Sequence, residues 1–180
     1  MDEPWPVLER AVEYETGWYT GGYDIVEQPD GSTKRYYWAA LAPAVVVVAL
    51  TPEAVVFVEQ YRPTVRQHHL ELPAGIVETG ETHVEAATRE LREETGYVAG
   101  RAELVQTYDV ATGVLRHERG VVVAEDLEAG EPARDANEFL EVRLIERERA
   151  IERARATPAN DASVSGLLLA AVDGYLEARG

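Results

Sequence analysis

The chain carries one uninterrupted hydrophobic run, Ala-Val-Val-Val-Val-Ala-Leu at residues 44–50. A continuous β-branched run of this length predicts a strand that is covered by protein on both faces. Residues 51–53 read Thr-Pro-Glu and predict a turn, so we expect the apolar residues 55–60 to form the hairpin partner of this strand. Apolar or alternating runs predict further strands at residues 101–108, 119–126 and 139–145.

Between residues 60 and 101 the hydrophobic positions take a helical period. Val84, Ala87 and Leu91 form an apolar stripe at helical spacing. Residues 80–82, Gly-Glu-Thr, supply turn and cap residues, and Gly96 is the expected C-terminal breaker. The pattern therefore predicts one central helix between these two glycine positions.

Two further helices are predicted near the C-terminus. Residues 146–155 carry mixed charges and predict a solvated surface helix. Residues 162–178 predict a helix with one buried face. That face is expected to contain Val164, Leu167, Leu168, Ala171, Val172 and Tyr175. Strands on both sides of a central helix, followed by a terminal helix, predict an α/β fold with a mixed sheet between helices, an α/β/α sandwich.

The first part of the chain has a different character. Residues 28–32 read Gln-Pro-Asp-Gly-Ser, a strong turn signal between the strand-like residues 23–27 and 34–38. We therefore expect an N-terminal β-hairpin appendage at residues 1–42, followed by the main domain at residues 43–180.

The chain is strongly acidic, with a net charge of −16, and Lys34 is its one lysine against sixteen arginines. This charge argues against nucleic acid or an anionic membrane as a partner, because both repel an acidic surface. High acidity with almost no lysine is similar to proteins of salt-loving archaea, in which concentrated salt screens the self-repulsion. An acidic protein from an ordinary habitat is the alternative.

Several other classes of site are excluded. The chain has no cysteine, which excludes disulfides and thiolate chemistry. No apolar run reaches the length of a membrane span, and the N-terminus lacks the order of a signal peptide, so a cytoplasmic location is expected. His68 and His69 have no second cluster to complete a zinc site, and we expect them in an exposed loop at residues 63–69.

Three carboxylates on the central helix suggest a metal site. Glu90, Glu93 and Glu94 fall at i, i+3 and i+4, so they lie on one face, where Arg89 can pair with Glu93. The natural partner of the remaining charge is a hard divalent cation, Mg²⁺ or Mn²⁺, although a solvated acidic face is the alternative. Metal on carboxylates suits phosphoanhydride hydrolysis, with one carboxylate as the general base; the residues leave open which one.

The spacing around this helix resembles the signature of the Nudix hydrolases. The matching positions are Gly75, Glu81, Arg89, Glu90, Glu93, Glu94 and Gly96. A wider similarity, to the ADP-ribose pyrophosphatase branch of that family, covers nearly the whole chain. It includes residues 29–31 (Pro-Asp-Gly), 58–62 (Val-Glu-Gln-Tyr-Arg), 71–75 (Glu-Leu-Pro-Ala-Gly) and 137–138 (Asn-Glu).

The resemblance implies the Nudix α/β/α fold and a divalent metal. Its implied metal ligands are the carbonyl of Ala74 with Glu90, Glu93, Glu94 and Glu138, and its implied catalytic residues are Arg89, Glu93, Glu94 and Glu138. Arg89 would orient the motif glutamates. Glu81 would support the loop or a metal-bound water.

The resemblance also implies a homodimer, in which the N-terminal β region exchanges between subunits and contributes substrate contacts. Arg62 is a candidate phosphate ligand, since guanidinium binds phosphate oxygens in a bidentate manner; a strand-end salt bridge is the alternative. Glu118 resembles a family residue near the terminal ribose. Trp18 and Tyr19 are our candidates among the N-terminal aromatic residues to stack on a nucleobase, although most such residues serve packing.

Two positions depart from the family pattern. Thr112 stands where relatives often carry a proline that marks ADP-ribose specificity. Ala136 stands where some relatives carry a catalytic base, so the base must come from Glu138, Asp135, Glu118 or a motif carboxylate. These departures affect the substrate more than the class of reaction.

The expected function is metal-dependent hydrolysis of a nucleoside diphosphate linked to a second moiety. ADP-ribose is the leading substrate, with AMP and ribose 5-phosphate as products. The alternatives are another nucleotide sugar, a dinucleoside polyphosphate or an oxidised nucleotide. An alternative of another class is a Nudix-like sensor that binds its ligand without cleaving it.

Overall fold

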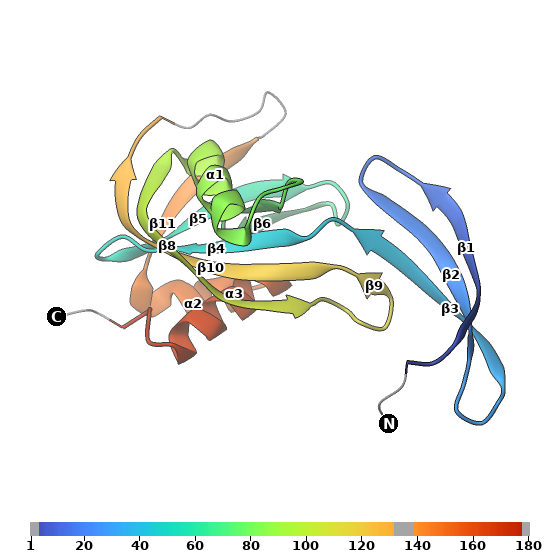
Figure 1. The fold of residues 1–180 in the computed structure, drawn as a ribbon. Helices are drawn as coiled ribbons and strands as arrows, with labels where there is room; N and C mark the ends of the chain where they lie inside the picture. Colours follow the sequence, from blue (N-terminus) through green and yellow to red (C-terminus); the bar gives the residue numbers. More distant parts are fainter. Residues whose placement is uncertain (1–3, 132–138, 178–180) are drawn as a thin grey trace. The chain divides into compact units, whose positions relative to one another are not determined.

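The computed structural model describes residues 4–131 and 139–177. The strands are β1 (Val7–Glu15), β2 (Tyr19–Glu27), β3 (Thr33–Leu41), β4 (Ala44–Ala49), β5 (Ala54–Arg62), β6 (Gln67–Glu71), β7 (Ala74–Ile76), β8 (Tyr97–Asp109), β9 (Leu115–Arg116), β10 (Glu118–Ala129) and β11 (Leu140–Glu146). The helices are α1 (His83–Thr95), α2 (Arg147–Arg155) and α3 (Asp161–Val172) (Figure 1).

The chain divides into two compact units. The N-terminal unit contains Met1–Pro43 and Tyr108–Arg119, and the larger unit contains Ala44–Thr107 and Gly120–Gly180. Residues 108–119, which were predicted to belong to the main domain, cluster with the N-terminal strands.

The N-terminal unit contains one sheet in the order β1-β2-β3-β9. β2 and β3 form an antiparallel hairpin whose register ends at Glu27↔Thr33, which confirms the predicted hairpin. At its turn, Gly31 has a φ of 80°, a conformation that favours glycine. The carboxylate of Asp30 accepts a hydrogen bond from the backbone N–H of Ser32 at 2.9 Å, which stabilises the turn.

A buried carboxylate holds β9 on this sheet. Oδ1 of Asp24 accepts hydrogen bonds from Nε1 of Trp38 at 2.9 Å and Nε of Arg10 at 3.3 Å. Its Oδ2 accepts one from Nη2 of Arg116 at 2.7 Å, and the Arg116 guanidinium lies 4.0 Å from the centre of the Trp38 ring. Burial acts to raise the pKa of Asp24, but the hydrogen bonds from Trp38 and Arg10 and the charge of Arg116 hold that pKa below its ordinary value.

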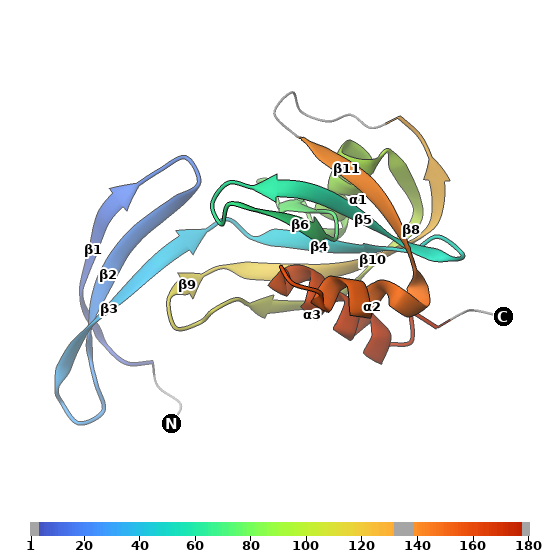
Figure 2. The ribbon, with the colours of Figure 1, turned by 180° about the vertical axis from the view of Figure 1, so that it is seen from behind.

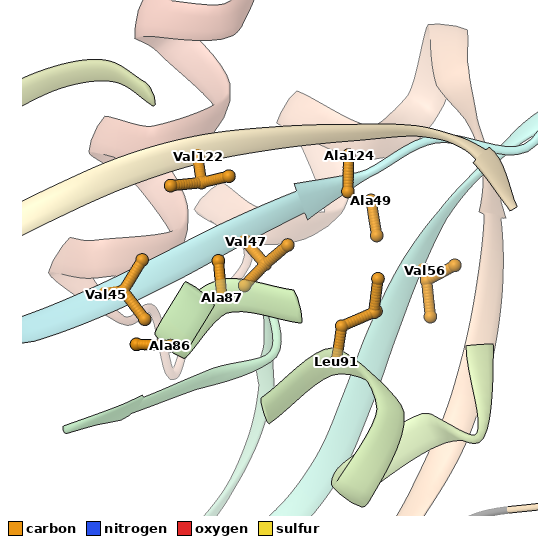
Figure 3. Packing of buried hydrophobic residues seen from close by; sticks show 9 residues of the cluster. All are labelled: Val45, Val47, Ala49, Val56, Ala86, Ala87, Leu91, Val122 and Ala124. Atoms are coloured by element: carbon orange, nitrogen blue, oxygen red, sulfur yellow. The ribbon is translucent and has the colours of Figure 1, made fainter. Parts of the chain in front are cut away.

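In the larger unit, β4 lies between helices on both faces. Figure 3 shows one face of β4 packed toward α1, through Val45, Val47, Ala49, Ala86, Ala87 and Leu91. On the other face, a Cβ at Gly166 of α3 would lie 3.4 Å from Val46 and 3.7 Å from Val48. Figures 1 and 2 show α1 on one side of β4, with α2 and α3 on the other. The predicted α/β/α sandwich and the two-sided burial of this strand are both confirmed.

The predicted pairing of the two central strands is wrong. β4 belongs to a sheet in the order β7-β4-β10-β8, whereas β5 belongs to a sheet in the order β11-β5-β6. An isolated antiparallel bridge, Leu50↔Val55, joins the chain where it passes from one strand to the other. Both strands are apolar on both faces, so each lies inside its own sheet between two neighbours, β7 and β10 for β4 and β11 and β6 for β5.

Helix α3 buries a different face from the predicted one. Its buried residues are Ser163, Gly166, Leu167 and Ala170. Leu167 is therefore confirmed, whereas Leu168 is 45% exposed and Val172 is 84% exposed. The helix is apolar nearly all round, so hydrophobic spacing does not single out one face. Its small residue Gly166 packs closely on β4.

The histidine prediction is also wrong in part. Gln67–Glu71 form β6 rather than a loop, so the side chains alternate between faces. His68 is exposed, but His69 is buried. Helix α2 is confirmed at the surface, with Ala150 and Ala154 on its buried side. In the described ranges, no helix is long and apolar enough to cross a membrane.

Candidate metal centre on helix α1

Helix α1 begins and ends where the sequence predicts. Thr82 caps its N-terminus: the Thr82 hydroxyl accepts from the N–H of Glu85 at 3.2 Å, and the Glu85 carboxylate accepts from the N–H of Thr82 at 2.8 Å. Gly96 ends the helix with a φ of 81° and donates its N–H to the carbonyl of Arg92 at 2.9 Å. With its apolar stripe packed on β4, the helix has a fixed rotation, and its acidic face turns toward β7.

Arg89 organises this acidic face. Its Nη1 donates to Oε1 of Glu90 at 2.7 Å and to Oε2 of Glu93 at 3.2 Å, so the predicted pairing with Glu93 is confirmed. Its Nε and Nη2 donate to the two oxygens of Glu81, each at 2.9 Å, and Nη2 also donates to the carbonyl of Ile76 at 2.9 Å. The hydrogen bonds with Glu81 raise the pKa of Arg89 above its ordinary value despite the opposing effect of burial, and Arg89 in turn lowers the pKa of Glu81.

The two buried carboxylates of α1 meet the chain at Ala74 and Gly75. Glu90 is 8% exposed and Glu94 is 6% exposed. The N–H of Ala74 donates to Oε2 of Glu94 at 3.3 Å. A Cβ at position 75 would lie 1.9 Å from Oε1 of Glu90, so the absence of a side chain there permits the approach of Glu90. The fold therefore brings Ala74, Glu90 and Glu94 together.

The chemistry of these groups fits a hard divalent cation. Carboxylate and carbonyl oxygens are the preferred ligands of Mg²⁺ and Mn²⁺. Among the described residues, no three His, Asp or Glu side chains already stand close enough to hold a metal ion. Glu90 and Glu93 point to Arg89, and Glu94 lies on the N–H of Ala74. The backbone of Ala74 and Gly75 already lies beside the side chains of Glu94 and Glu90. Rotation of these carboxylates is therefore enough to exchange their present partners for a cation.

Two candidate residues and one position that departs from the family pattern lie outside this description. Glu138, Asp135 and Ala136 fall in residues 132–138, beyond the described ranges. The candidate general bases that the structure does describe are the motif carboxylates and Glu118.

Arg62 forms the strand-end salt bridge that the sequence left as an alternative. Its Nε donates to Oε2 of Glu71 at 3.0 Å and to Oε1 at 3.2 Å, and its Nη2 also donates to this carboxylate. The Glu71 side chain is 3% exposed, and it also accepts from Nε2 of Gln60 at 3.1 Å and Nδ2 of Asn160 at 3.1 Å. The Arg62 side chain remains 42% exposed.

Sequence reasoning missed the roles of Glu71 and Asn160. A lone carboxylate in the apolar segment Leu70-Glu71-Leu72 was an available signal for a buried charged group that needs partners. Asn160 precedes the apolar run of α3 and has the residue type that caps helices, which was a second signal.

The remaining candidates belong to the N-terminal unit. Trp18 is 81% exposed and Tyr19 is 37% exposed. Their backbone N–H groups both donate to the hydroxyl of Thr16, at 3.1 Å and 2.9 Å, which fixes the turn between β1 and β2. Tyr19 also packs edge to face on Tyr14, with ring centres 5.5 Å apart. Glu118 is exposed at the start of β10.

Comparisons with known proteins place this site in a family. The family model described as NUDIX domain matches residues 40–166. The ADP-ribose pyrophosphatase of Bacillus subtilis (strain 168) is 32% identical over 143 residues, which cover 78% of this chain and 77% of that protein. The methanol dehydrogenase activator of Bacillus methanolicus is 37% identical over 124 residues, which cover 68% of this chain and 67% of that protein.

The fold has a similar match among solved structures. The crystal structure of an ADP compounds hydrolase superposes with a TM-score of 0.85 at 22% identity, covering 96% of this chain and 97% of the other. The chain belongs to the Nudix family.

Proposed function

We propose that this protein is a divalent-metal-dependent pyrophosphatase that hydrolyses ADP-ribose to AMP and ribose 5-phosphate. The observation that carries the proposal is the arrangement of α1 against β7, with Glu90 at Gly75 and Glu94 at Ala74. The similarity to the Bacillus subtilis ADP-ribose pyrophosphatase supports the choice of substrate.

Glu90, Glu93, Glu94 and the carbonyl of Ala74 would hold the metal, and Glu138 would add a ligand from residues 132–138. Mg²⁺ is the expected ion and Mn²⁺ the alternative. A bound divalent ion neutralises charge that develops on phosphate oxygens and lowers the pKa of water. Arg89 keeps the ligands Glu90 and Glu93 oriented through a guanidinium that is itself held by Glu81.

Proton transfer needs a carboxylate that water can reach. The side chain of Glu93 is 39% exposed, compared with 11% for Glu90 and 22% for Glu81. Glu93 is therefore our candidate to accept the proton of the attacking water, with Glu118 and Glu138 as the alternatives.

Substrate contacts are assigned on chemistry. Arg62 would contact a phosphate through the part of its guanidinium that Glu71 does not occupy, because Nε and Nη2 already serve that ion pair. Trp18 would stack on the base, since its ring is largely exposed. Tyr19 and Glu118 complete the proposed set. We also propose that the N-terminal unit forms a homodimer, which light scattering in KCl solution tests, and that the protein acts in the cytoplasm.

The substrate is tested with a panel of nucleotides in Mg²⁺ and concentrated KCl, with products separated by chromatography. The panel contains ADP-ribose, other nucleotide sugars, dinucleoside polyphosphates and oxidised nucleotides, because Thr112 replaces the family's specificity proline. AMP and ribose 5-phosphate from ADP-ribose, lost on addition of EDTA, are the expected result. Faster turnover of another panel member would reassign the substrate, and no turnover at all would favour a sensor.

A further inference from the structure

Two residues, Leu72 and Pro73, carry the chain from one sheet to the other immediately before the candidate metal centre. β6 pairs with β5 as far as Glu71, and β7 pairs with β4 from Ala74 onward. Leu72 and Pro73 therefore lie between the two registers. Whatever holds this two-residue link also determines where Ala74 and Gly75 meet the carboxylates of α1.

A side chain of α3 holds the link. The N–H of Leu72 donates to Oγ of Ser163 at 2.9 Å, across 91 residues of sequence. Ser163 is 1% exposed and Leu72 is 1% exposed, so water cannot replace this acceptor. Pro73 has no N–H, and its carbonyl accepts from the N–H of Val47 at 2.8 Å. The Leu72 N–H is thus the one hydrogen-bond donor of the link, and α3 supplies its acceptor.

Asn160 connects the same helix to the residue that precedes the link. Its Oδ1 caps α3 by accepting from the N–H of Ser163 at 3.0 Å. Its Nδ2 donates to Oε1 of Glu71 at 3.1 Å. The same carboxylate of Glu71 also accepts hydrogen bonds from Arg62, and it is nearly fully buried. The first turn of α3 therefore holds both Glu71 and Leu72.

We propose that Asn160 and Ser163 are positioning residues for the metal centre. They fix the Leu72-Pro73 link, so that the carbonyl of Ala74 and the bare backbone of Gly75 lie where Glu94 and Glu90 can share a cation with them. This inference rests on the proposed function. A small displacement of the link would disturb both contacts. The Ala74–Glu94 hydrogen bond is already long at 3.3 Å, and Oε1 of Glu90 fills the space beside Gly75.

A purely structural role would have a different signature. Loss of a cap or of a buried hydrogen bond lowers stability whether or not the metal centre is affected. A positioning role weakens metal binding in molecules that are still folded. The two roles are therefore separated by measuring metal affinity well below the melting temperature of every variant.

Two variants break the connection at different atoms. Ser163→Ala removes the acceptor of the Leu72 N–H. Asn160→Ser keeps a hydroxyl that can cap α3 but is too short to reach Glu71. Two variants of the same helix serve as controls. Ser165→Ala makes the same chemical change at a serine whose hydroxyl donates to the carbonyl of Asp161. Leu167→Val removes one methylene group from a fully buried side chain of this helix and leaves both Asn160 and Ser163 in place.

Binding of Mn²⁺ alone is measured on the full chain by the loss of the free-ion paramagnetic resonance signal. We expect the Mn²⁺ dissociation constant to rise about tenfold in Ser163→Ala and Asn160→Ser, the size typical of lost support behind metal ligands. The Mn²⁺ dissociation constants of both control variants should stay within about twofold of the wild-type value. The KM for ADP-ribose at saturating Mn²⁺ should change little in all four variants.

Equal Mn²⁺ affinity in the two test variants and the controls would overturn the inference while leaving the proposed function intact. An equal loss of affinity in Leu167→Val would also overturn it, since general destabilisation would then explain the effect. If the wild type neither binds Mn²⁺ nor hydrolyses ADP-ribose, the proposed function itself fails.

Discussion

Oε1 of Glu90 occupies the space that a side chain at Gly75 would need, 1.9 Å from the position of its Cβ. The group in the way is the end of a flexible side chain rather than backbone. A larger residue at position 75 would therefore displace the carboxylate and leave the fold in place.

Gly75→Ala should separate metal binding from folding. We expect Mn²⁺ affinity and ADP-ribose hydrolysis to fall about tenfold or more, because Glu90 must leave its place beside the backbone of residue 75. Calorimetry should still show a cooperative transition, lowered by an amount typical of mild overpacking, about 1–3 kcal/mol. Gly17→Ala is the control, since nothing lies within 4 Å of a Cβ there, and it should change neither property. Normal Mn²⁺ affinity in Gly75→Ala would show that Glu90 is not a ligand.

Arg147 should contribute to stability without contributing to activity. Its Nε and Nη2 donate to the carbonyl of Thr51 at 3.0 and 2.6 Å, and its Nη1 donates to the carbonyls of Tyr175 and Glu177 at 3.3 and 3.4 Å. Hydrogen bonds from charged donors contribute roughly 1.5–3 kcal/mol each, so Arg147→Ala should lower the free energy of unfolding by about 2 kcal/mol or more. Denaturant unfolding measures this change.

The matched control is Arg149→Ala on the same helix. Arg149 is 56% exposed in its side chain and makes a 4.0 Å ion pair with Glu152. Exposed pairs of this kind contribute little, so the change should stay within about 0.5 kcal/mol. Similar losses in both variants would mean that Arg147 does not hold the C-terminal segment to the β4–β5 turn.

Asp24 should make the N-terminal unit sensitive to acid. Its pKa in the folded protein is lowered, so the folded state favours the ionised form. The stability that comes from its bonds to Trp38, Arg10 and Arg116 is fully present above the unfolded pKa, near about 4, and is lost as pH falls through the lower folded value.

The measurement compares melting temperatures of the wild type and Asp24→Asn from neutral pH to about pH 3. Asparagine removes the charge at every pH, so the variant should melt lower at neutral pH. The gap should then narrow as the pH falls below about 4. A gap of constant size across this range would contradict the assignment.

Salt should stabilise the protein. The net charge of −16 creates self-repulsion in the folded state. Raising KCl from about 0.1 M to about 1 M shortens the Debye length from about 10 Å to about 3 Å and screens this repulsion. We therefore expect the melting temperature to rise with KCl. A melting temperature that does not respond to KCl would refute the proposed salt dependence.

Local signals in the sequence predicted the elements well. The two ends of α1, at Thr82 and Gly96, were predictable because capping depends only on residues within one turn of the helix end. The uninterrupted valines of β4 predicted burial on both faces, which the opposite contacts of Val45 and Val46 confirm. The pairing of Arg89 with Glu93 follows from helical spacing alone.

Long-range relationships were beyond the same reasoning. The hydrophobic pattern could not predict that β4 and β5 lie in different sheets, since both strands are apolar on both faces. Hydrophobic spacing could not choose the face of α3, because Ser163 and Gly166 are buried for close contact rather than for apolar area. The bond from Leu72 to Ser163 joins residues that only the three-dimensional fold brings together.

The central claim is that the carboxylates of α1 hold the metal that hydrolysis requires. The most direct measurement compares Mg²⁺-dependent release of AMP from ADP-ribose by the wild type and by Glu94→Gln in concentrated KCl. Glutamine keeps the shape and an oxygen acceptor for the N–H of Ala74 but removes the charge. The predicted result is a rate lower by about a hundredfold or more at an unchanged melting temperature. A folded Glu94→Gln protein with a rate within a few-fold of the wild type would contradict the claim.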